Sequence, residues 1–380
     1  MTSPSGGGKP ARAGSGSSAR MSPAERLARA LSAKFLEDGN YGASLSQFGG
    51  ATSGLTPSAI AGKEFEAAFA ESGFAGLAVQ AVGYSEGSDA EAVYVYVAKG
   101  RQRNISGEEF TDDETPIRVR KIGRLTVKPE AASGTTNRGN LFQRGKRIAC
   151  GSSCAPSAEN YSGTLGAIVR DSGTKELFVL SNNHVIGACN HTPVGQPILS
   201  PSNSDSHFKN PAPIEIARHE RICELRSGTP TLVNPCSEDV AIARVTDPTR
   251  ISSWQGDAGG YDTPTAVTDP VAGMSVVKFG RTTGKTTGRV EARIPTDTPI
   301  PFRMKYFTAT VWFRDVWTVL GDEGDPFALP GDSGSLVVSE DGKHAIGLVF
   351  AAAGDYGVII PMPHVLSCLG GLELVGKHGV

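Results

Sequence analysis

The sequence predicts a mainly β protein in which a smaller α/β module precedes the β-rich region. The chain of 380 residues contains 47 glycines and 24 prolines, an excess that indicates many turns. From about Ser162 onward, short apolar runs recur between turn residues without any long internal repeat, which is typical of an all-β sandwich or barrel. These runs are Thr164–Val169, Leu177–Leu180, Val240–Val245, Ser275–Phe279, Thr308–Phe313, Ser335–Val338, Ile346–Phe350 and Val358–Ile360.

The N-terminal region divides into a tail and a module. Residues 1–20 are rich in glycine and serine and contain no apolar segment, so we expect a disordered tail and no secretory signal. Residues 21–130 combine helical and strand patterns and predict a small α/β module. Its expected elements are a helix from the Ser22–Glu25 capping box to about Gly39, a helix from Thr56 to about Ser72, and strands at Leu77–Val82, Val93–Val97 and Ile117–Val127.

Residues 131–157 have no hydrophobic periodicity, so we expect a linker there and a second folded unit over residues 158–380. The longest apolar run, Ala345–Ala353, is too short to span a bilayer as a helix, and no membrane partner is expected. A net charge of −2 argues against nucleic-acid binding. Six cysteines without a secretory signal predict reduced thiols in the cytoplasm.

Two groups of residues have side chains that bind metal ions in other proteins. The acidic turn Asp322–Asp325 lacks the ligand spacing of a calcium loop, and the histidines and cysteines match no standard zinc spacing. We therefore expect no metal and no cofactor. The histidines and cysteines concerned are Cys150, Cys154, Cys189, His191, His207, His219 and Cys223.

The strongest chemical signal is a serine between two glycines, in the segment Gly331-Asp332-Ser333-Gly334. A serine hydroxyl becomes a nucleophile only with a base in hydrogen-bond reach, an acid that orients the base, and donors for the oxyanion. Glycines allow a loop to turn its N–H groups inward as such donors. Elsewhere, His184 ends one apolar strand and Asp239 begins another, which provides a candidate base and a candidate acid.

In these motifs and in their order, the chain from Ser162 to Leu369 resembles the chymotrypsin-like (trypsin-like) serine proteases. Within that family, Gly163–Gly166, Ser181–Val185 and Lys278–Gly284 are most similar to intracellular bacterial trypsin-like proteins and their plant narrow-leaf-type relatives. The resemblance implies a double β-barrel with a catalytic triad in the cleft between the barrels. Its members are Ser333 as nucleophile, His184 as base and Asp239 as orienting acid, with an oxyanion hole in the loop Gly331, Asp332 and Ser333 formed by the N–H groups of Gly331 and Ser333.

The chain departs from secreted members of that family in how it can hold Asp332. No activation cleavage segment is evident between Tyr161 and Leu165, so no new N-terminus is expected to pair with this carboxylate. A buried carboxylate requires a partner. The resemblance to the bacterial relatives makes a basic side chain of the second barrel the candidate, either Lys278 or Arg281.

The substrate pocket is expected, by the same resemblance, beside the strand that follows the nucleophile. Phe327 occupies the floor position, where no acid is present to receive lysine or arginine, and this favours an apolar or small side chain at the cleaved position. Asp325, two residues earlier, leaves a carboxylate in the pocket as the alternative. The pocket residues are Phe327, Phe350, Ala351, Ala352 and Gly357.

These features favour a soluble serine endopeptidase, a trypsin-like hydrolase of protein or peptide substrates. Its N-terminal module is expected to regulate it or to bind a regulatory partner. Two alternatives stay open. One is a catalytically silent protein of the same fold that binds a peptide without cleaving it, and the other is a latent protease that awaits an effector.

Overall fold

The computed structural model describes residues 21–37, 78–86, 91–99, 109–112, 115–128, 139–206, 210–228 and 238–380. The expected tail at residues 1–20 and the expected second helix at Thr56–Ser72 lie outside these ranges. Within them the protein is mainly β, as the sequence predicts.

The first barrel unit is an antiparallel sheet of eight strands in the order β25-β9-β10-β13-β12-β11-β7-β8. The central strand β10 places Leu180 opposite Ala167 of β9 and Ile242 of β13, and these three side chains are buried. The strands are β7 (Ser153–Pro156), β8 (Gly163–Thr164), β9 (Ala167–Asp171), β10 (Leu177–Ser181), β11 (Pro197–Ser200), β12 (Ile214–Ile222), β13 (Ala241–Val245) and β25 (Leu372–Leu374).

The second barrel is a closed ring of six strands in the order β17-β22-β23-β24-β21-β18, because β17 also pairs with β18. All of these pairings are antiparallel, and the interior contains Val290, Val319, Val349 and Ile359 packed around Phe327. The strands are β17 (Ser275–Gly280), β18 (Gly284–Ile294), β21 (Val316–Gly321), β22 (Leu336–Ser339), β23 (His344–Ala353) and β24 (Tyr356–Pro361). The double β-barrel that the sequence resemblance implies is thereby confirmed.

Shorter elements connect and extend the two barrels. The expected linker at residues 131–157 is wrong for its described part, because β5, β6 and β7 lie there and bury Ile148, Cys150 and Cys154 against the first barrel. Strands of two to four residues are too short to show a periodicity in the sequence. The shorter elements are β5 (Gln143–Arg144), β6 (Arg147–Cys150), β14 (Ile251–Gln255), β15 (Tyr261–Asp262), β16 (Ala266–Val267), β19 (Thr298–Arg303), β20 (Thr308–Phe313), α4 (Asn183–Ile186) and α5 (Met362–Cys368), with 3₁₀ turns at Asn203–Asp205, Pro248–Arg250 and Asp322–Gly324.

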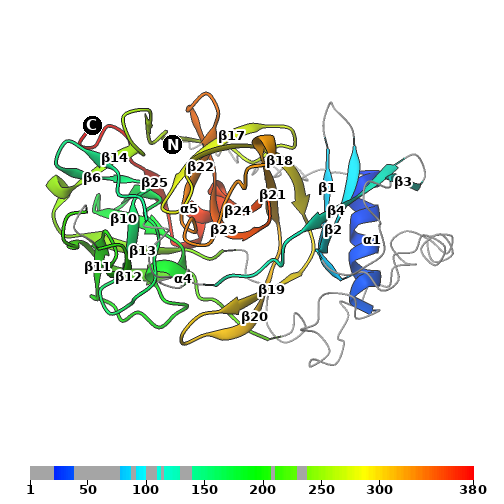
Figure 1. Cartoon of the computed structure of the whole chain (residues 1–380), viewed down its shortest axis with the longest axis horizontal. Coiled ribbons are helices and arrows are strands. Elements are labelled where there is room, and N and C mark those ends of the chain that lie inside the picture. Colours follow the sequence, from blue (N-terminus) through cyan, green and yellow to red (C-terminus); the bar gives the residue numbers. More distant parts are fainter. Residues whose placement is uncertain are drawn as a thin grey trace, which may run out of the picture.

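The N-terminal module consists of helix α1 (Pro23–Glu37) on strands β1 (Val79–Ser85), β2 (Ala92–Ala98), β3 (Glu109–Asp112) and β4 (Thr115–Ile122). The helix begins where predicted, since the Ser22 hydroxyl accepts a hydrogen bond of 3.1 Å from the Glu25 N–H. Its apolar face packs on the strands of the module (Figure 1). Strand β1 pairs with β18, so the sheet of the module continues the sheet of the second barrel.

The last strand of the module is shorter than predicted. Strand β4 ends at Ile122, whereas the sequence pattern continues to Val127. Beyond it, Thr126 forms an isolated antiparallel bridge with Ala352 of β23, and Val127 forms a parallel bridge with Phe302 of β19. The segment that leaves the module therefore lies between strand β23 of the second barrel and strand β19, which forms a hairpin with β20.

One disulfide corrects the expectation that all cysteines are reduced. Cys223 at the end of β12 is bonded to Cys368 at the end of α5, with a Cα–Cα distance of 6.4 Å. Their separation of 145 residues hides this proximity in the sequence. Cys150, Cys154 and Cys189 are buried free thiols, and Cys236 lies outside the described residues. None of the helices in the described ranges is long and apolar enough to cross a membrane.

The disulfide closes a long loop, so its loss should destabilise the fold. Replacing Cys223 and Cys368 by alanine should lower the free energy of unfolding by about 2–4 kcal/mol, measured by denaturant titration. A reductant should lower the stability of the native protein by a similar amount and leave the variant unchanged. Equal stability of the two proteins without reductant would contradict the bond.

Candidate active site

His184 and Asp239 form a buried pair at the cleft side of the first barrel. Asp239 lies just before β13, and its carboxylate accepts hydrogen bonds from the backbone N–H of His184 at 2.9 Å and from the imidazole Nδ1. Asn182 fixes the backbone of Asp239, because its side-chain amide donates to the Asp239 carbonyl at 2.6 Å. His184 is 4% exposed and Asp239 is fully buried. The imidazole is thus fixed with Nδ1 toward the acid and Nε2 left for another partner.

Ser333 lies on the second barrel, in the loop before β22, and is half-buried. Its hydroxyl donates to the carbonyl of Phe350 at 3.4 Å, and among the described residues it makes no hydrogen bond with His184. The N–H groups of Gly331 and Ser333 donate to no described residue, whereas the N–H of Asp332 bonds the Leu329 carbonyl at 2.9 Å. The two predicted oxyanion donors, the N–H groups of Gly331 and Ser333, therefore have no described partner, whereas the N–H group of Asp332 between them is already used.

The side chain of Asp332 is buried and anchors this loop to the hairpin between β17 and β18. Lys278 Nζ lies 3.5 Å from its carboxylate, and both residues are fully buried. The same carboxylate accepts from the N–H groups of Thr282 and Thr283 at 2.8 and 3.1 Å and from the Thr283 hydroxyl at 2.8 Å. Burial lowers the pKa of Lys278, and the Asp332 carboxylate opposes this shift. Of the two predicted partners, Lys278 is the residue that pairs with Asp332.

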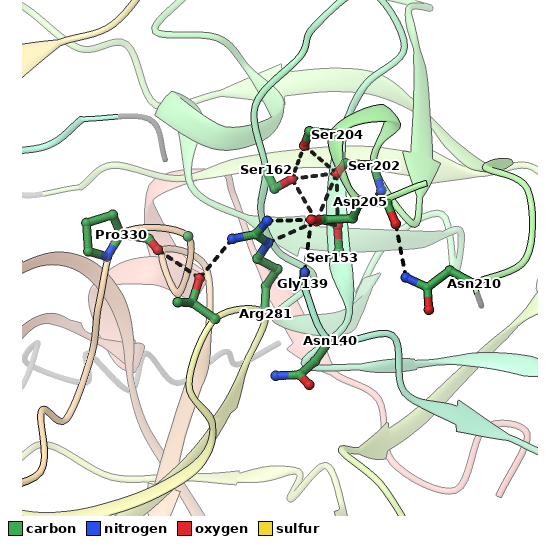
Figure 2. A network of polar contacts seen from close by, with 12 residues as sticks. Gly139, Asn140, Ser153, Ser162, Ser202, Ser204, Asp205, Asn210, Arg281 and Pro330 are labelled. Carbon is green, nitrogen blue, oxygen red and sulfur yellow. Dashed lines mark hydrogen bonds and ion pairs between the residues drawn. The ribbon is translucent and has the colours of Figure 1, made fainter. Parts of the chain in front are cut away.

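Arg281, the other predicted partner, forms its ion pair with Asp205 of the first barrel (Figure 2). Its Nε donates to the Asp205 carboxylate at 2.9 Å, and its Nη2 donates to the second oxygen. Burial lowers the pKa of Arg281 to about 10, opposed by the charge of Asp332, so it stays charged at neutral pH. Asp205 also accepts hydrogen bonds from the Gly139 N–H and from the hydroxyls of Ser153, Ser162 and Ser202.

Thr282 fixes the peptide bond between Pro330 and Gly331. Leu329 to Asp332 form a turn of type II, with Gly331 at φ 98°, a conformation that glycine adopts at little cost. The hydroxyl of Thr282 donates to the Pro330 carbonyl at 2.7 Å and accepts from Arg281 at 3.2 Å. Because a trans peptide is planar, the Gly331 N–H points away from that carbonyl and from Thr282.

A hairpin formed by β19 and β20 covers His184. Phe302 of β19 is 1% exposed and contacts the imidazole edge-to-face, with ring centroids 6.0 Å apart. At the hairpin tip, Lys305 lies 3.7 Å from Glu159, and the Tyr306 ring lies 6.0 Å from that of His191, both on the first barrel unit. The hairpin thus bridges the two barrels beside α4 (Figure 1).

The structure separates the predicted pocket residues into two groups. Phe350, Ala351 and Ala352 line a cavity of about 400 Å³ that includes Ser333. Phe327 is fully buried in the second barrel and does not line this cavity, and neither does Gly357. A Cβ added at Gly357 would stand 2.7 Å from the Phe327 ring, so these two residues pack against each other. Asp325 does not line the cavity either.

Sequence reasoning missed Asp205, Thr282 and Phe302. Thr282 follows Arg281 in a motif that was singled out, but only the folded hairpin brings its hydroxyl to Pro330. Among the described residues, no three histidine, cysteine or acidic side chains gather where they could hold a metal ion. His207 lies outside the described residues. Burial raises the pKa of Cys154 to about 12, so this thiol is unreactive at neutral pH.

Two barrel units with His184 and Asp239 on the first and Ser333 on the second define the fold of the chymotrypsin-like serine proteases. Protease A of Thermobifida fusca is 19% identical, covers 60% of this chain and 100% of its own, and has a TM-score of 0.40. Nocardiopsis protease is 17% identical, covers 60% of this chain and 97% of its own, and has a TM-score of 0.39. Cellulomonas bogoriensis chymotrypsin is 15% identical, covers 60% of this chain and 98% of its own, and has a TM-score of 0.38. No protein-family model and no curated protein matches the chain. Identities of this size concern the fold alone, and the chemistry depends on this chain's own residues.

Replacing Lys278 by methionine should strongly destabilise the protein, because it removes the buried counter-ion of the Asp332 carboxylate. We expect the free energy of unfolding to fall by about 3–5 kcal/mol. Lys285→Met on the same hairpin is the matched control, since Lys285 is exposed, and should change stability by less than about 0.5 kcal/mol. Similar effects of the two substitutions, measured by denaturant titration, would show that the buried pair is not an anchor.

Proposed function

We propose that the protein is a serine endopeptidase that cleaves peptide bonds through His184, Asp239 and Ser333 and an acyl-enzyme intermediate. The observation that carries the proposal is the buried His184–Asp239 pair, which leaves Nε2 of the imidazole for another partner while the serine loop is anchored through Asp332. A peptide-binding scaffold has no use for a buried imidazole and carboxylate held in this way. The chymotrypsin-like fold supports the proposal, because proteins of this fold include proteases that act on peptide bonds.

In the reaction, the Ser333 hydroxyl leaves the Phe350 carbonyl and donates to Nε2 of His184. His184 takes the hydroxyl proton as Ser333 attacks the scissile carbonyl, and it returns the proton to the leaving amine. Asp239 keeps the Nδ1 proton in place and stabilises the imidazolium. Water then attacks the acyl-enzyme with His184 again as base.

The oxyanion of the tetrahedral intermediate is stabilised by the N–H groups of Gly331 and Ser333, which have no described partner. Thr282 positions the first of these donors through the Pro330 carbonyl. The Cys223–Cys368 bond favours an oxidising compartment over the cytoplasm expected from the cysteine count. Regulation by a partner of the N-terminal module stays a prediction.

A fluorophosphonate probe tests the nucleophile directly. The native protein should be labelled and should hydrolyse casein, and Ser333→Ala should abolish both because the proposed nucleophile is removed. Ser172→Ala, at an exposed serine of the first barrel, should behave as the native protein. Labelling that survives in Ser333→Ala would contradict the proposal, and no labelling of the native protein under any condition would favour the catalytically silent alternative.

The role of Thr282 is tested by Thr282→Val, which keeps the shape of the side chain and removes the hydroxyl. The Pro330–Gly331 peptide then loses its anchor, and kcat should fall roughly ten- to a hundredfold with KM little changed, since the lost contact acts in the transition state. Thr287→Val on the same hairpin, at an exposed position, should leave kcat unchanged. A kcat unaltered by Thr282→Val would show that the peptide needs no such anchor.

A further inference from the structure

The cavity beside Ser333 has a strongly positive lining. Of the described side chains that line it, those of Arg124, Lys128 and Arg303 are basic and none is acidic. A fourth cation lies at its edge, because Lys99 Nζ would be 3.8 Å from a Cβ built on the lining residue Gly354. A cavity lined by charges of one sign raises the local concentration of ligands of the opposite sign.

These lining cations have no acidic partner among the described residues. Arg124, Lys128 and Arg303 are exposed, and none of them makes an ion pair or a side-chain hydrogen bond with a residue in the described part of the chain. Elsewhere in the molecule, arginines such as Arg120 and Arg314 are paired with carboxylates. Like charges held close together repel each other, and a bound anion relieves that repulsion.

The backbone holds the basic side chains in place. Arg124 and Lys128 lie on the segment that leaves the N-terminal module, where the N–H of Val127 donates to Pro301 at 2.9 Å and its carbonyl accepts from the N–H of Arg303 at 2.8 Å. At the start of the segment, a Cβ on Gly123 would stand 2.9 Å from the backbone nitrogen of Gly354, so the two chains approach closely. The module thereby supplies one wall of the cavity.

The rest of the lining is uncharged. It includes Ala328 to Pro330, Ser333 and Val349 to Gly354. An aspartate or glutamate side chain that enters the cavity would bring its own carboxylate to the cations.

We propose that this cavity binds an acidic side chain of a peptide substrate, aspartate or glutamate, at or next to the bond that Ser333 attacks. The proposal rests on the proposed function and names its substrate class. It replaces the apolar preference expected from Phe327, because that residue is buried in the second barrel and does not line the cavity.

Fluorogenic peptides that differ at one position test the proposal. We expect kcat/KM to be at least about tenfold higher with glutamate than with glutamine at the preferred position, equivalent to about 1.4 kcal/mol. In the double variant Arg124→Glu and Arg303→Glu the two new carboxylates balance the charges of Lys128 and Lys99, so the ratio should fall to about one. Lys146→Glu makes a single charge reversal at an exposed residue outside the cavity and should keep the native ratio.

A binding measurement separates failure of this proposal from failure of the proposed function. Fluorescence anisotropy of the same peptides on Ser333→Ala, which cannot acylate, should show tighter binding of the glutamate peptide than of the glutamine peptide, lost in the charge-reversed variant. That result supports the cavity even in a protein that cleaves nothing. Equal binding and equal cleavage of the two peptides would overturn it, and so would a preference for arginine. Competition by inorganic phosphate without any difference between the two peptides would identify a free-anion site and also overturn it.

Discussion

The buried carboxylate of Asp332 is the constraint on which the rest of the site depends. Removing a charge from water costs several kcal/mol unless a counter-ion and hydrogen bonds replace the solvent. The hairpin formed by β17 and β18 supplies the counter-ion through Lys278. It supplies the hydrogen bonds through the N–H groups of Thr282 and Thr283 and the hydroxyl of Thr283. The loop that carries Ser333 can therefore adopt its geometry only while this hairpin is folded against it.

The same hairpin joins the two barrels. Arg281 follows the β17 strand that contains Lys278, and its bidentate pair with Asp205 attaches the hairpin to the first barrel. Removal of either partner would leave the other charge buried without compensation. Lys278 pairs with the carboxylate that anchors the serine loop, and Arg281 joins the two barrels. These two residues are only three positions apart in the sequence.

The sequence predicted those parts of the molecule that depend on local pattern and on a short motif. The capping box located α1, the apolar runs located most strands, and the glycines around Ser333 located the loop. The pairing of Cys223 with Cys368 and the contact of Phe302 with His184 each depend on how distant segments meet in the fold. No local sequence pattern indicates either contact. The alternative between Lys278 and Arg281 could not be resolved from residue type, because both are basic and both are buried beside a carboxylate.

The position of the cations also explains why overall charge was a poor guide to the ligand. A net charge of −2 averages over the whole surface and excludes only partners that bind through bulk charge. Arg124 and Lys128 reach the cavity because the module continues the sheet of the second barrel and its chain then bridges to Ala352. Tyr96 strengthens that junction, since its buried hydroxyl bonds Glu291 at 2.6 Å and Thr318 at 2.8 Å across it. The positive lining of the cavity is therefore a property of the junction between module and barrel, since Arg124 and Lys128 come from the segment that leaves the module and Arg303 comes from β19.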